Sequence, residues 1–256
     1  MVEITSSSNN KCKYVKSLSQ KKTRQKCGEY TIEGIKSVSD ALKSERTITA
    51  LYLYDSFYNN EAFSYPENIP LYKVNDDIFS KICDTVAPQG ILAVVKMEKA
   101  DSFEVDLSKA YIYCDCINDP GNLGTIIRTA DAAGFGGVLL SEGCVDLYSP
   151  KTVRSSMGSF FNMQVVTDVS YDMLKSYKDK GFSLFGGALG ANTIDYREAD
   201  MKKPSIIIVG NEANGISETV MEMCQCVKIP ILGKAESLNA GVAAAILMYE
   251  LVRQRS

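Results

Sequence analysis

The sequence predicts an α/β protein of two domains, the second of which contains a parallel β-sheet. Strand-like and helix-like runs alternate along the chain, as in sheets covered by helices. The run Ile206–Val209 is apolar at every position, which is typical of a parallel strand buried on both faces. A charged stretch from Glu98 to Ser108 lacks an apolar period. We therefore expect a first domain over 1–98, a linker over 99–108 and a second domain over 109–256.

The first domain is expected to be a small α/β unit of about 95 residues, which is enough for one core. Residues 1–10 are polar and predict a frayed tail, and Lys11 to Lys26 predicts a helix that Gly28 ends. Strands and helices then alternate. The strands are predicted at 30–33, 49–54, 71–74 and 91–97, and the helices at 35–44, 56–63 and 76–83.

The second domain is expected to continue the alternation of strands and helices. Its last helix is apolar or small almost all round, so we expect both of its sides to be buried, which suits a dimer interface. The strands are predicted at 110–115, 137–140, 162–167, 182–185, 205–209 and 226–229, and the helices at 123–133, 150–157, 171–180, 218–224 and 238–253.

Composition places limits on the class of protein. The chain has 256 residues, a formal net charge of -3 and a hydrophobic content of 45%, which fit a soluble globular protein rather than a disordered one. No stretch approaches the roughly 20 apolar residues that span a bilayer, and the amino terminus carries no basic region followed by an apolar one. We therefore expect a cytoplasmic protein without a membrane segment.

Cysteine and histidine usage limits the available chemistry. Eight cysteines are scattered along the chain, and the pairs Cys114/Cys116 and Cys224/Cys226 fall inside strand-like runs. Without a C-x-x-C or any histidine, buried reduced thiols are favoured over a metal site, so no metal is expected. Because histidine is absent, proton transfer at neutral pH must use a carboxylate, a perturbed Lys or Cys, water or the substrate.

A basic stripe lies near the amino terminus, where no acidic residue interrupts it. Such a stripe neutralises phosphates, although a solvated helix face has the same composition. Its members are Lys11, Lys13, Lys16, Lys21, Lys22, Arg24 and Lys26.

Three segments of the second domain each join a strand to a polar loop and then to a helix. They are Asn118–Gly137, Ile206–Ser217 and Lys228–Tyr249. Loops of this kind lie at the carboxyl ends of strands, where open α/β sheets bind ligands. The polar residues expected there are Asn122, Arg128, Glu212, Ser237 and Asn239.

The loop Gly210–Ser217 nearly matches a nucleotide phosphate-binding loop, but Ile216 replaces the lysine and Glu212 would repel phosphates. A nucleoside triphosphatase is therefore disfavoured. The glycines at 121–124 and 186–190 fail the dinucleotide spacing and are explained by tight turns. A cationic sulfonium would tolerate Glu212, which favours a methyl donor.

Two further features have both a functional and a structural explanation. The Arg128 side chain, among apolar neighbours, either runs toward the loop end of the sheet or is a plain surface arginine. Ser237 or Asn239 is suited to cap the last helix.

Together the three loops resemble the signature motifs of the SpoU (TrmH-like) RNA ribose 2′-O-methyltransferases. The matching segments are Asn118–Ala130, Ile208–Ser217, and Ile229–Pro230 with Glu236–Asn239, and the resemblance covers 110–253. Residues 151–158 also resemble the family, whereas Ala240-Gly241 stands where many members carry Val-Ser. The resemblance implies a trefoil-knotted sheet, one of the rare knotted folds. It also implies a homodimer with active sites at its interface, and a first domain that binds RNA.

The resemblance also implies roles for individual residues. S-adenosylmethionine would be held by the backbone at Gly210, Ile229 and Leu238, and we add Gly187 and Gly215 as cofactor-binding positions. RNA would contact the basic stripe and Arg154. The residues that match the family's functional positions are Asn122, Arg128, Glu212, Ser237 and Asn239.

The implied chemistry is an in-line attack of a ribose 2′-hydroxyl on the donor's methyl carbon. We expect Arg128 to offset charge that develops on the attacking oxygen, and Asn122 to orient Arg128 or the adjacent phosphate. A guanidinium scarcely deprotonates, so the proton is expected to leave to a phosphate oxygen or to water.

An ancillary domain and a basic first helix favour ribosomal RNA over transfer RNA, because a large structured target rewards a second binding surface. Two other classes stay open from the sequence: a catalytically inactive RNA-binding member of the same fold, and a nicotinamide oxidoreductase, which the glycine spacings disfavour.

Overall fold

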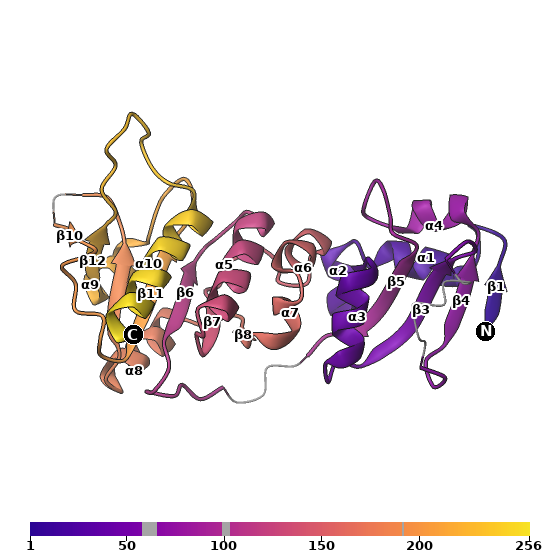
Figure 1. Cartoon of the computed structure of the whole chain (residues 1–256), viewed down its shortest axis with the longest axis horizontal. Coiled ribbons are helices and arrows are strands. Elements are labelled where there is room, and N and C mark those ends of the chain that lie inside the picture. Colours follow the sequence, from indigo (N-terminus) through magenta and orange to yellow (C-terminus); the bar gives the residue numbers. More distant parts are fainter. Residues whose placement is uncertain (58–65, 99–102, 191) are drawn as a thin grey trace. The chain divides into compact units, whose positions relative to one another are not determined.

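The computed structural model describes residues 1–57, 66–98, 103–190 and 192–256 (Figure 1). The chain forms two compact units. The first comprises Met1–Lys99 together with Tyr148–Phe161, and the second comprises Ala100–Leu147 with Asn162–Ser256. Residues 148–161, expected in the second domain, thus belong in space to the first unit. Residues 58–63 of the helix predicted at 56–63, and residues 99–102 of the linker, lie outside the described residues.

The first unit is built on a five-stranded mixed sheet with the order β1-β4-β3-β5-β2. Strand β4 is parallel to β1 and β3, whereas β5 is antiparallel to β2 and β3. The predicted frayed tail is wrong, because β1 pairs with β4 and buries Ile4. The strands are β1 (Val2–Ile4), β2 (Glu29–Glu33), β3 (Ile48–Tyr54), β4 (Leu71–Val74) and β5 (Ile91–Lys96).

The predicted helix over 11–26 is two helices in the structure, α1 (Asn10–Ser17) and α2 (Lys21–Cys27). The chain turns between them, and the Arg24 guanidinium donates to the carbonyls of Leu18 and Ser19, both at 2.7 Å. Gly28 ends α2 with a φ of 66°, as predicted. The unit also contains α3 (Ile35–Lys43), α4 (Asp76–Ile82), α6 (Pro150–Ser156) and α7 (Ser159–Asn162).

Aromatic packing holds the segment Tyr148–Phe161 in the first unit. The Tyr30 ring of β2 lies 4.9 Å from the Tyr148 ring and 5.7 Å from the Phe160 ring, measured between centroids. Arg154 of α6 also forms an ion pair with Asp84 at 3.2 Å. The packed rings bury large apolar surfaces, whereas the ion pair is exposed, so the rings contribute more to stability than the ion pair does.

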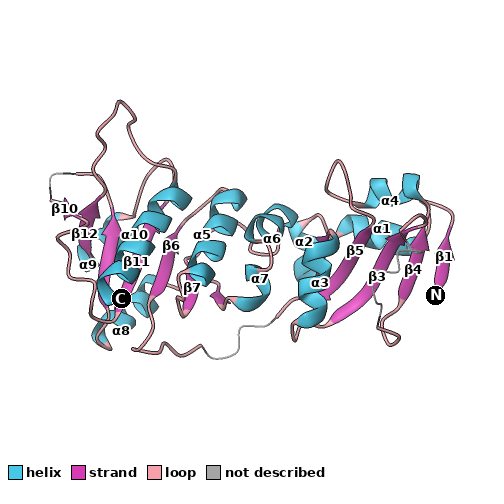
Figure 2. Cartoon of the chain, in the orientation of Figure 1, coloured by secondary structure: helices cyan, strands magenta, loops and turns pink. Residues whose placement is uncertain are grey.

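The second unit contains a seven-stranded sheet with the order β10-β12-β9-β11-β6-β7-β8 (Figure 2). Every pairing in it is parallel, as the apolar strand pattern predicted. The short strand β10 was not predicted, because it lies in a polar stretch that contains no apolar run. The strands are β6 (Tyr111–Asp115), β7 (Gly137–Leu140), β8 (Val165–Val166), β9 (Ser183–Gly187), β10 (Ile194–Asp195), β11 (Ser205–Gly210) and β12 (Gln225–Lys228).

Helices cover both faces of this sheet. Helices α5 (Pro120–Ala132) and α10 (Ala240–Arg255) pack against each other, and α10 also contacts β9 and β11 (Figure 1). Helices α8 (Tyr171–Asp179) and α9 (Glu218–Met223) share a hydrophobic core with the other face through Leu174, Tyr177 and Val220. The sheet is therefore the middle layer of three.

Two helix starts differ from the predicted ones in a way that affects the site. Helix α5 begins at Pro120 rather than 123, because the Asp119 carboxylate caps it by accepting from the Asn122 N–H at 2.8 Å. Helix α10 begins at Ala240, and Asn239, rather than Ser237, is its cap. Asn122 and Asn239 thus lie at the amino-terminal ends of two adjacent helices.

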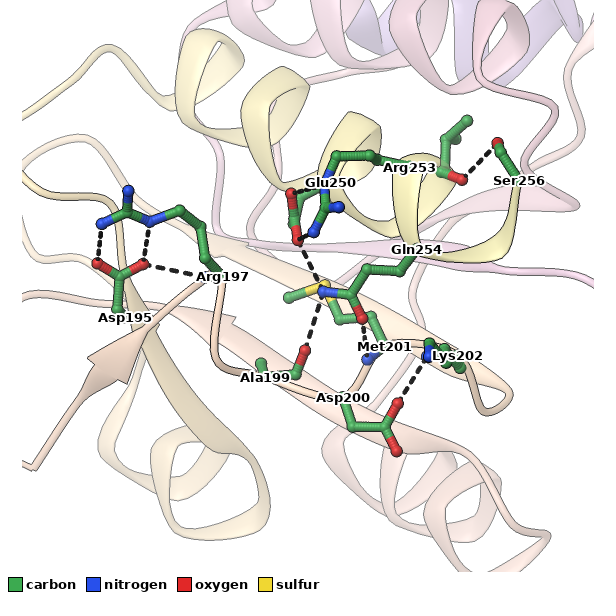
Figure 3. Close-up of polar contacts among 11 residues, drawn as sticks. Asp195, Arg197, Ala199, Asp200, Met201, Lys202, Glu250, Arg253, Gln254 and Ser256 are labelled. Carbon is green, nitrogen blue, oxygen red and sulfur yellow. Dashed lines mark hydrogen bonds and ion pairs between the residues drawn. The ribbon is translucent and has the colours of Figure 1, made fainter.

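The far end of α10 is fixed to the segment that precedes β11 (Figure 3). The Gln254 amide donates to the Ala199 carbonyl at 3.0 Å, and its oxygen accepts from the Met201 N–H at 2.9 Å. Glu250 accepts from both Arg253 and Gln254 at 2.7 Å. The two Gln254 contacts fix the carboxyl-terminal end of α10, and the opposite end of this helix lies at the cavity described next.

Candidate active site

A cavity of about 510 Å³ lies at the carboxyl ends of β9, β11 and β12. This volume is within the range of small-molecule sites. Its walls come from 187–189, 209–216 and the chain that leads from β12 into α10. Among the described residues, its lining includes the carboxylates of Glu212 and Glu236 but no lysine or arginine. Seven of the predicted site residues line it: Gly187, Gly210, Glu212, Gly215, Ile229, Ser237 and Leu238.

The loop after β11 is folded tightly, and glycines make this possible. Asn211 and Gly215 exchange two backbone hydrogen bonds, of 2.9 and 2.8 Å, and Gly215 has a φ of 71°. A Cβ on Gly210 would lie only 2.1 Å from the backbone of Gly215. No side chain fits at position 210, because the backbone of Gly215 and Ile216 fills that space, and Gly210 itself lines the cavity.

A chain of three side chains joins the three predicted loops. The Asn122 amide donates to the Glu212 carboxylate at 2.7 Å, and the Asn239 amide donates to the Asn122 carbonyl oxygen at 2.8 Å. Asn122 is buried, with 8% of its surface exposed. Since Asn239 also accepts from the backbone N–H groups of Gly241 and Val242, its orientation is fixed.

The charge of Glu212 is stabilised by hydrogen bonds. Burial by itself would raise the pKa of Glu212, but the hydrogen bond from Asn122 and those from backbone N–H groups, including Asn118 and Asp119, outweigh it, and the pKa is lowered. Glu212 is therefore ionised at neutral pH. A carboxylate in this state is a weak base, and its main effect is to hold the loops together and to make the cavity negative.

Arg128 lies apart from this chain of side chains. It is exposed on α5 and is not part of the cavity wall. Within the described residues no hydrogen bond or ion pair involves its guanidinium, which leaves it available to a substrate. Asn122 is hydrogen-bonded to Glu212 and Asn239 rather than to Arg128.

Comparison with known proteins identifies the family. Residues 109–249 match the SpoU rRNA Methylase family, and residues 9–93 match the MRM3-like substrate binding domain. The chain is 36% identical to the 23S rRNA (guanosine(2553)-2′-O)-methyltransferase RlmP of Bacillus subtilis, over 98% of this chain and 99% of that protein. This chain belongs to the SpoU rRNA methylase family.

Solved structures of family members have the same fold. The AdoMet-bound rRNA methyltransferase of Sinorhizobium meliloti superposes with a TM-score of 0.88 at 32% identity, over 98% of this chain and 97% of that one. The SpoU methyltransferase AviRb of Streptomyces viridochromogenes, in complex with the cofactor AdoMet, gives 0.84 at 29% identity, over 96% and 99%. The similarity extends over both units.

The basic stripe of this SpoU protein has one member that does not face solvent. Arg24 is buried, with 3% of its surface exposed, and its guanidinium binds two backbone carbonyls. The prediction that Arg24 contacts RNA is therefore wrong, and its role is to hold α1 and α2 together. Arg154 is exposed and paired with Asp84. The remaining members are exposed: Lys11, Lys13, Lys16, Lys21, Lys22 and Lys26.

Asn211 shapes the cavity of this SpoU protein but was not predicted from the sequence. The Asn211 amide donates to the Cys116 carbonyl at 2.9 Å, and its oxygen accepts from the Ala213 and Asn214 N–H groups at 2.9 and 3.1 Å. The available signal was an asparagine directly after a glycine at a strand end, where Asx turns are common.

Two further findings concern the described part of the chain. All eight cysteines are unbonded thiols, and no cluster of His, Cys, Asp and Glu suited to a metal ion occurs there. Likewise, none of the described helices combines the length and apolar character that a bilayer crossing requires.

Proposed function

We propose that this protein transfers a methyl group from S-adenosylmethionine to a ribose 2′-hydroxyl of ribosomal RNA. The observation that carries this proposal is the hydrogen-bonded chain Glu212–Asn122–Asn239 beside the cavity, because it unites the three motifs of the family in one place. The names of two relatives that match most of this chain agree with the proposal: both are 23S rRNA 2′-O-methyltransferases, from Bacillus subtilis and from Streptomyces viridochromogenes.

The cavity fits the proposed donor. Backbone groups at Gly210, Ile229 and Leu238 line it and can hydrogen-bond a nucleoside, with Gly187 and Gly215 in the same wall. The carboxylates of Glu212 and Glu236 make the site favourable for a cation. When bound, the donor supplies an electrophilic methyl group on a positively charged sulfur.

The chain's own residues then position and stabilise the attacking group. We assign Arg128 to the ribose oxygen, where its guanidinium offsets developing negative charge. Ser237, in the cavity wall, offers a hydroxyl to the ribose or to the donor. Asn122 and Asn239 act by holding Glu212 and the two helix starts in place. Because Glu212 is a weak base and the guanidinium stays protonated, the 2′-hydroxyl proton leaves to a phosphate oxygen or to water.

We further propose a homodimer and a trefoil-knotted second unit, as the family resemblance implies. Exposed apolar side chains support the dimer: Leu238, Val242 and Tyr249 are 37, 47 and 50% exposed along the start and outer face of α10. A second copy that covers these side chains would also bring its own site residues close to the cavity of the first copy. Light scattering of the wild type and of Tyr249→Asp tests this, since a charge in the interface should shift the mass toward the monomer.

We also propose that the exposed lysines of the basic stripe, with Arg154, contact the RNA, and that the reaction takes place in the cytoplasm. The match of residues 9–93 to a substrate binding domain supports the first point. Ribosomal RNA is favoured over transfer RNA, since both units match rRNA methyltransferases over nearly their full length.

Mapping 2′-O-methyl groups on RNA from cells with and without the gene tests the proposal directly. One nucleotide of ribosomal RNA should lack its 2′-O-methyl group in cells without the gene. The wild-type protein should restore this methyl group, and Arg128→Lys should not. A change confined to transfer RNA would redirect the substrate assignment. No change in any RNA, with no donor binding by calorimetry, would indicate an inactive RNA-binding member of the family.

A further inference from the structure

Another carboxylate, Asp115, lies beside the start of the cavity loop and is not part of the cavity wall. Asp115 is the last residue of β6 and only 1% exposed. One carboxylate oxygen accepts from the Ser217 N–H at 2.8 Å, and the other accepts from the Tyr171 hydroxyl at 3.1 Å. Both partners are far away in the sequence, so one buried carboxylate joins three elements of the second unit.

The Ser217 N–H marks the point where the cavity loop ends. Ser217 is the cap residue of α9, and Ile216, directly before it, is 4% exposed and lines the cavity. Asp115 is also the register partner of Gly210, where the same loop begins. Asp115 is therefore next to the start of the loop in the sheet and is hydrogen-bonded to its end.

The chain that follows Asp115 holds the rest of the loop. The Cys116 carbonyl accepts from Asn211 at 2.9 Å, and the Glu212 carboxylate accepts from the backbone N–H groups of Asn118 and Asp119 at 3.3 and 3.4 Å. The loop is thus fixed at its start, its middle and its end by one short segment. The contact at its end is the shortest of the four, at 2.8 Å, and its acceptor is a buried carboxylate, so its loss leaves a polar group that water does not readily reach.

We propose that Asp115 is a positioning residue for the methyl donor: it fixes the Ser217 amide, and through it the wall formed by Gly215 and Ile216. This inference rests on the proposed function, because it takes the cavity to be the donor site. Asp115 does not line the cavity, so its effect is on donor affinity and not on the chemical step. Its loss leaves the Ser217 N–H without the acceptor that the structure gives it, and the end of the loop is free to move.

Three variants of the full-length protein test the proposal: Asp115→Ala, Asp115→Asn and Tyr171→Phe. Calorimetry should give a Kd for S-adenosylmethionine at least tenfold higher in Asp115→Ala, with the donor KM raised by a similar factor. At saturating donor kcat should fall less than threefold, and the RNA Kd should be unchanged. Asp115→Asn keeps an acceptor for Ser217 and should stay within about threefold of wild type, as should Tyr171→Phe, which keeps the Ser217 contact.

The outcomes distinguish a failure of the proposed function from a failure of the role proposed for Asp115. A wild-type protein that fails to bind the donor contradicts the proposed function itself. A wild type that binds it, with Asp115→Ala folded and equal to it in donor affinity, overturns the role of Asp115 alone. A parallel loss of donor affinity, RNA affinity and Tm in all three variants would show a merely structural role. If Asp115→Ala does not fold, amide exchange in Asp115→Leu decides, because leucine fills the space of the carboxylate but offers no acceptor to Ser217: faster exchange at 211–217 alone supports the proposal, and unchanged exchange opposes it.

Discussion

The side-chain amide of Asn122 donates a hydrogen bond to the Glu212 carboxylate at 2.7 Å, although 90 residues separate them. The other end of the same side chain accepts from Asn239 at 2.8 Å. One buried asparagine therefore connects the start of α5, the loop after β11 and the start of α10. Its amide can satisfy a donor and an acceptor at once, which neither aspartate nor alanine can do in this place.

Replacing this residue should disable the site. Asn122→Asp places a second carboxylate beside Glu212, so we expect at least a tenfold rise in the donor Kd and a loss of turnover of about 100-fold, in line with the removal of a charge-assisted hydrogen bond. Asn118→Ala is the matched control, because Asn118 contributes only its backbone N–H to Glu212. Equal activity of Asn122→Asp and wild type would contradict the connecting role.

Glu212 should make stability depend on pH. Its pKa is lowered below the ordinary value of 4.5, so its stabilising contribution is present above pH 4.5 and is lost as the pH falls through the lowered pKa. Urea unfolding of wild type and Glu212→Gln at several pH values measures this. The difference in free energy of unfolding should be largest near neutrality and shrink in acid. A difference that grows as the pH falls would mean that the pKa is raised instead.

Arg128 should be needed for turnover and not for folding. Arg128→Lys keeps the charge but loses the planar fork, so we expect kcat to fall by about 100-fold at every pH tested. Because Arg128 is exposed, Tm and donor affinity should stay at wild-type values. Full activity of the lysine variant across the pH range would remove Arg128 from the mechanism.

Gly210 should tolerate no side chain. A Cβ there would lie 2.1 Å from the Gly215 backbone, so Gly210→Ala must open the loop and should abolish donor binding or lower Tm by several degrees. Gly233→Ala is the control, because a Cβ at Gly233 meets nothing within 4 Å. Calorimetry and thermal unfolding of the two variants give the comparison.

Two neighbouring basic residues should have opposite phenotypes. Arg24→Gln removes a buried guanidinium from two carbonyls and should lower the free energy of unfolding by about 2–3 kcal/mol. Lys22→Gln should leave stability unchanged, weaken RNA binding and reduce the salt slope by about one. Titrations with RNA at several salt concentrations, together with urea unfolding, distinguish the two. Loss of RNA affinity in a fully stable Arg24→Gln would reverse the assignment.

The periodic features of the fold could be predicted from the sequence. The apolar run Ile206–Val209 predicted a buried parallel strand, and β11 pairs in parallel with both β6 and β9. Short elements whose stability comes from a partner far away in the sequence could not be predicted. Strand β1 has three residues, and its stability comes from β4, which lies about 70 residues further on and leaves no trace in the local pattern.

The site was predictable as a set of positions but not as a set of contacts. Glu212, Ser237 and Leu238, which the sequence singled out, line the cavity. The hydrogen bonds from Asn122 to Glu212 and from Asn239 to Asn122 were not predicted, because the hydrogen-bond partner of a side-chain amide depends on the tertiary structure. Arg24 was assigned to RNA because of its charge, but a sequence does not reveal whether a guanidinium faces solvent or binds backbone carbonyls inside the protein. Asp115 gave no signal at all, because a carboxylate at the end of a strand is ordinary in sequence.

The position of Tyr148 and Phe160 beside Tyr30 matters to anyone who wishes to cut this protein in two. A fragment that starts at residue 109 would carry both rings away from their partner and expose them to water, which invites aggregation. A fragment that stops at residue 98 would leave Tyr30 uncovered for the same reason. To express the two units separately, residues 148–161 must be joined to the amino-terminal fragment, and residues 147 and 162 of the carboxyl-terminal fragment must be connected by a linker.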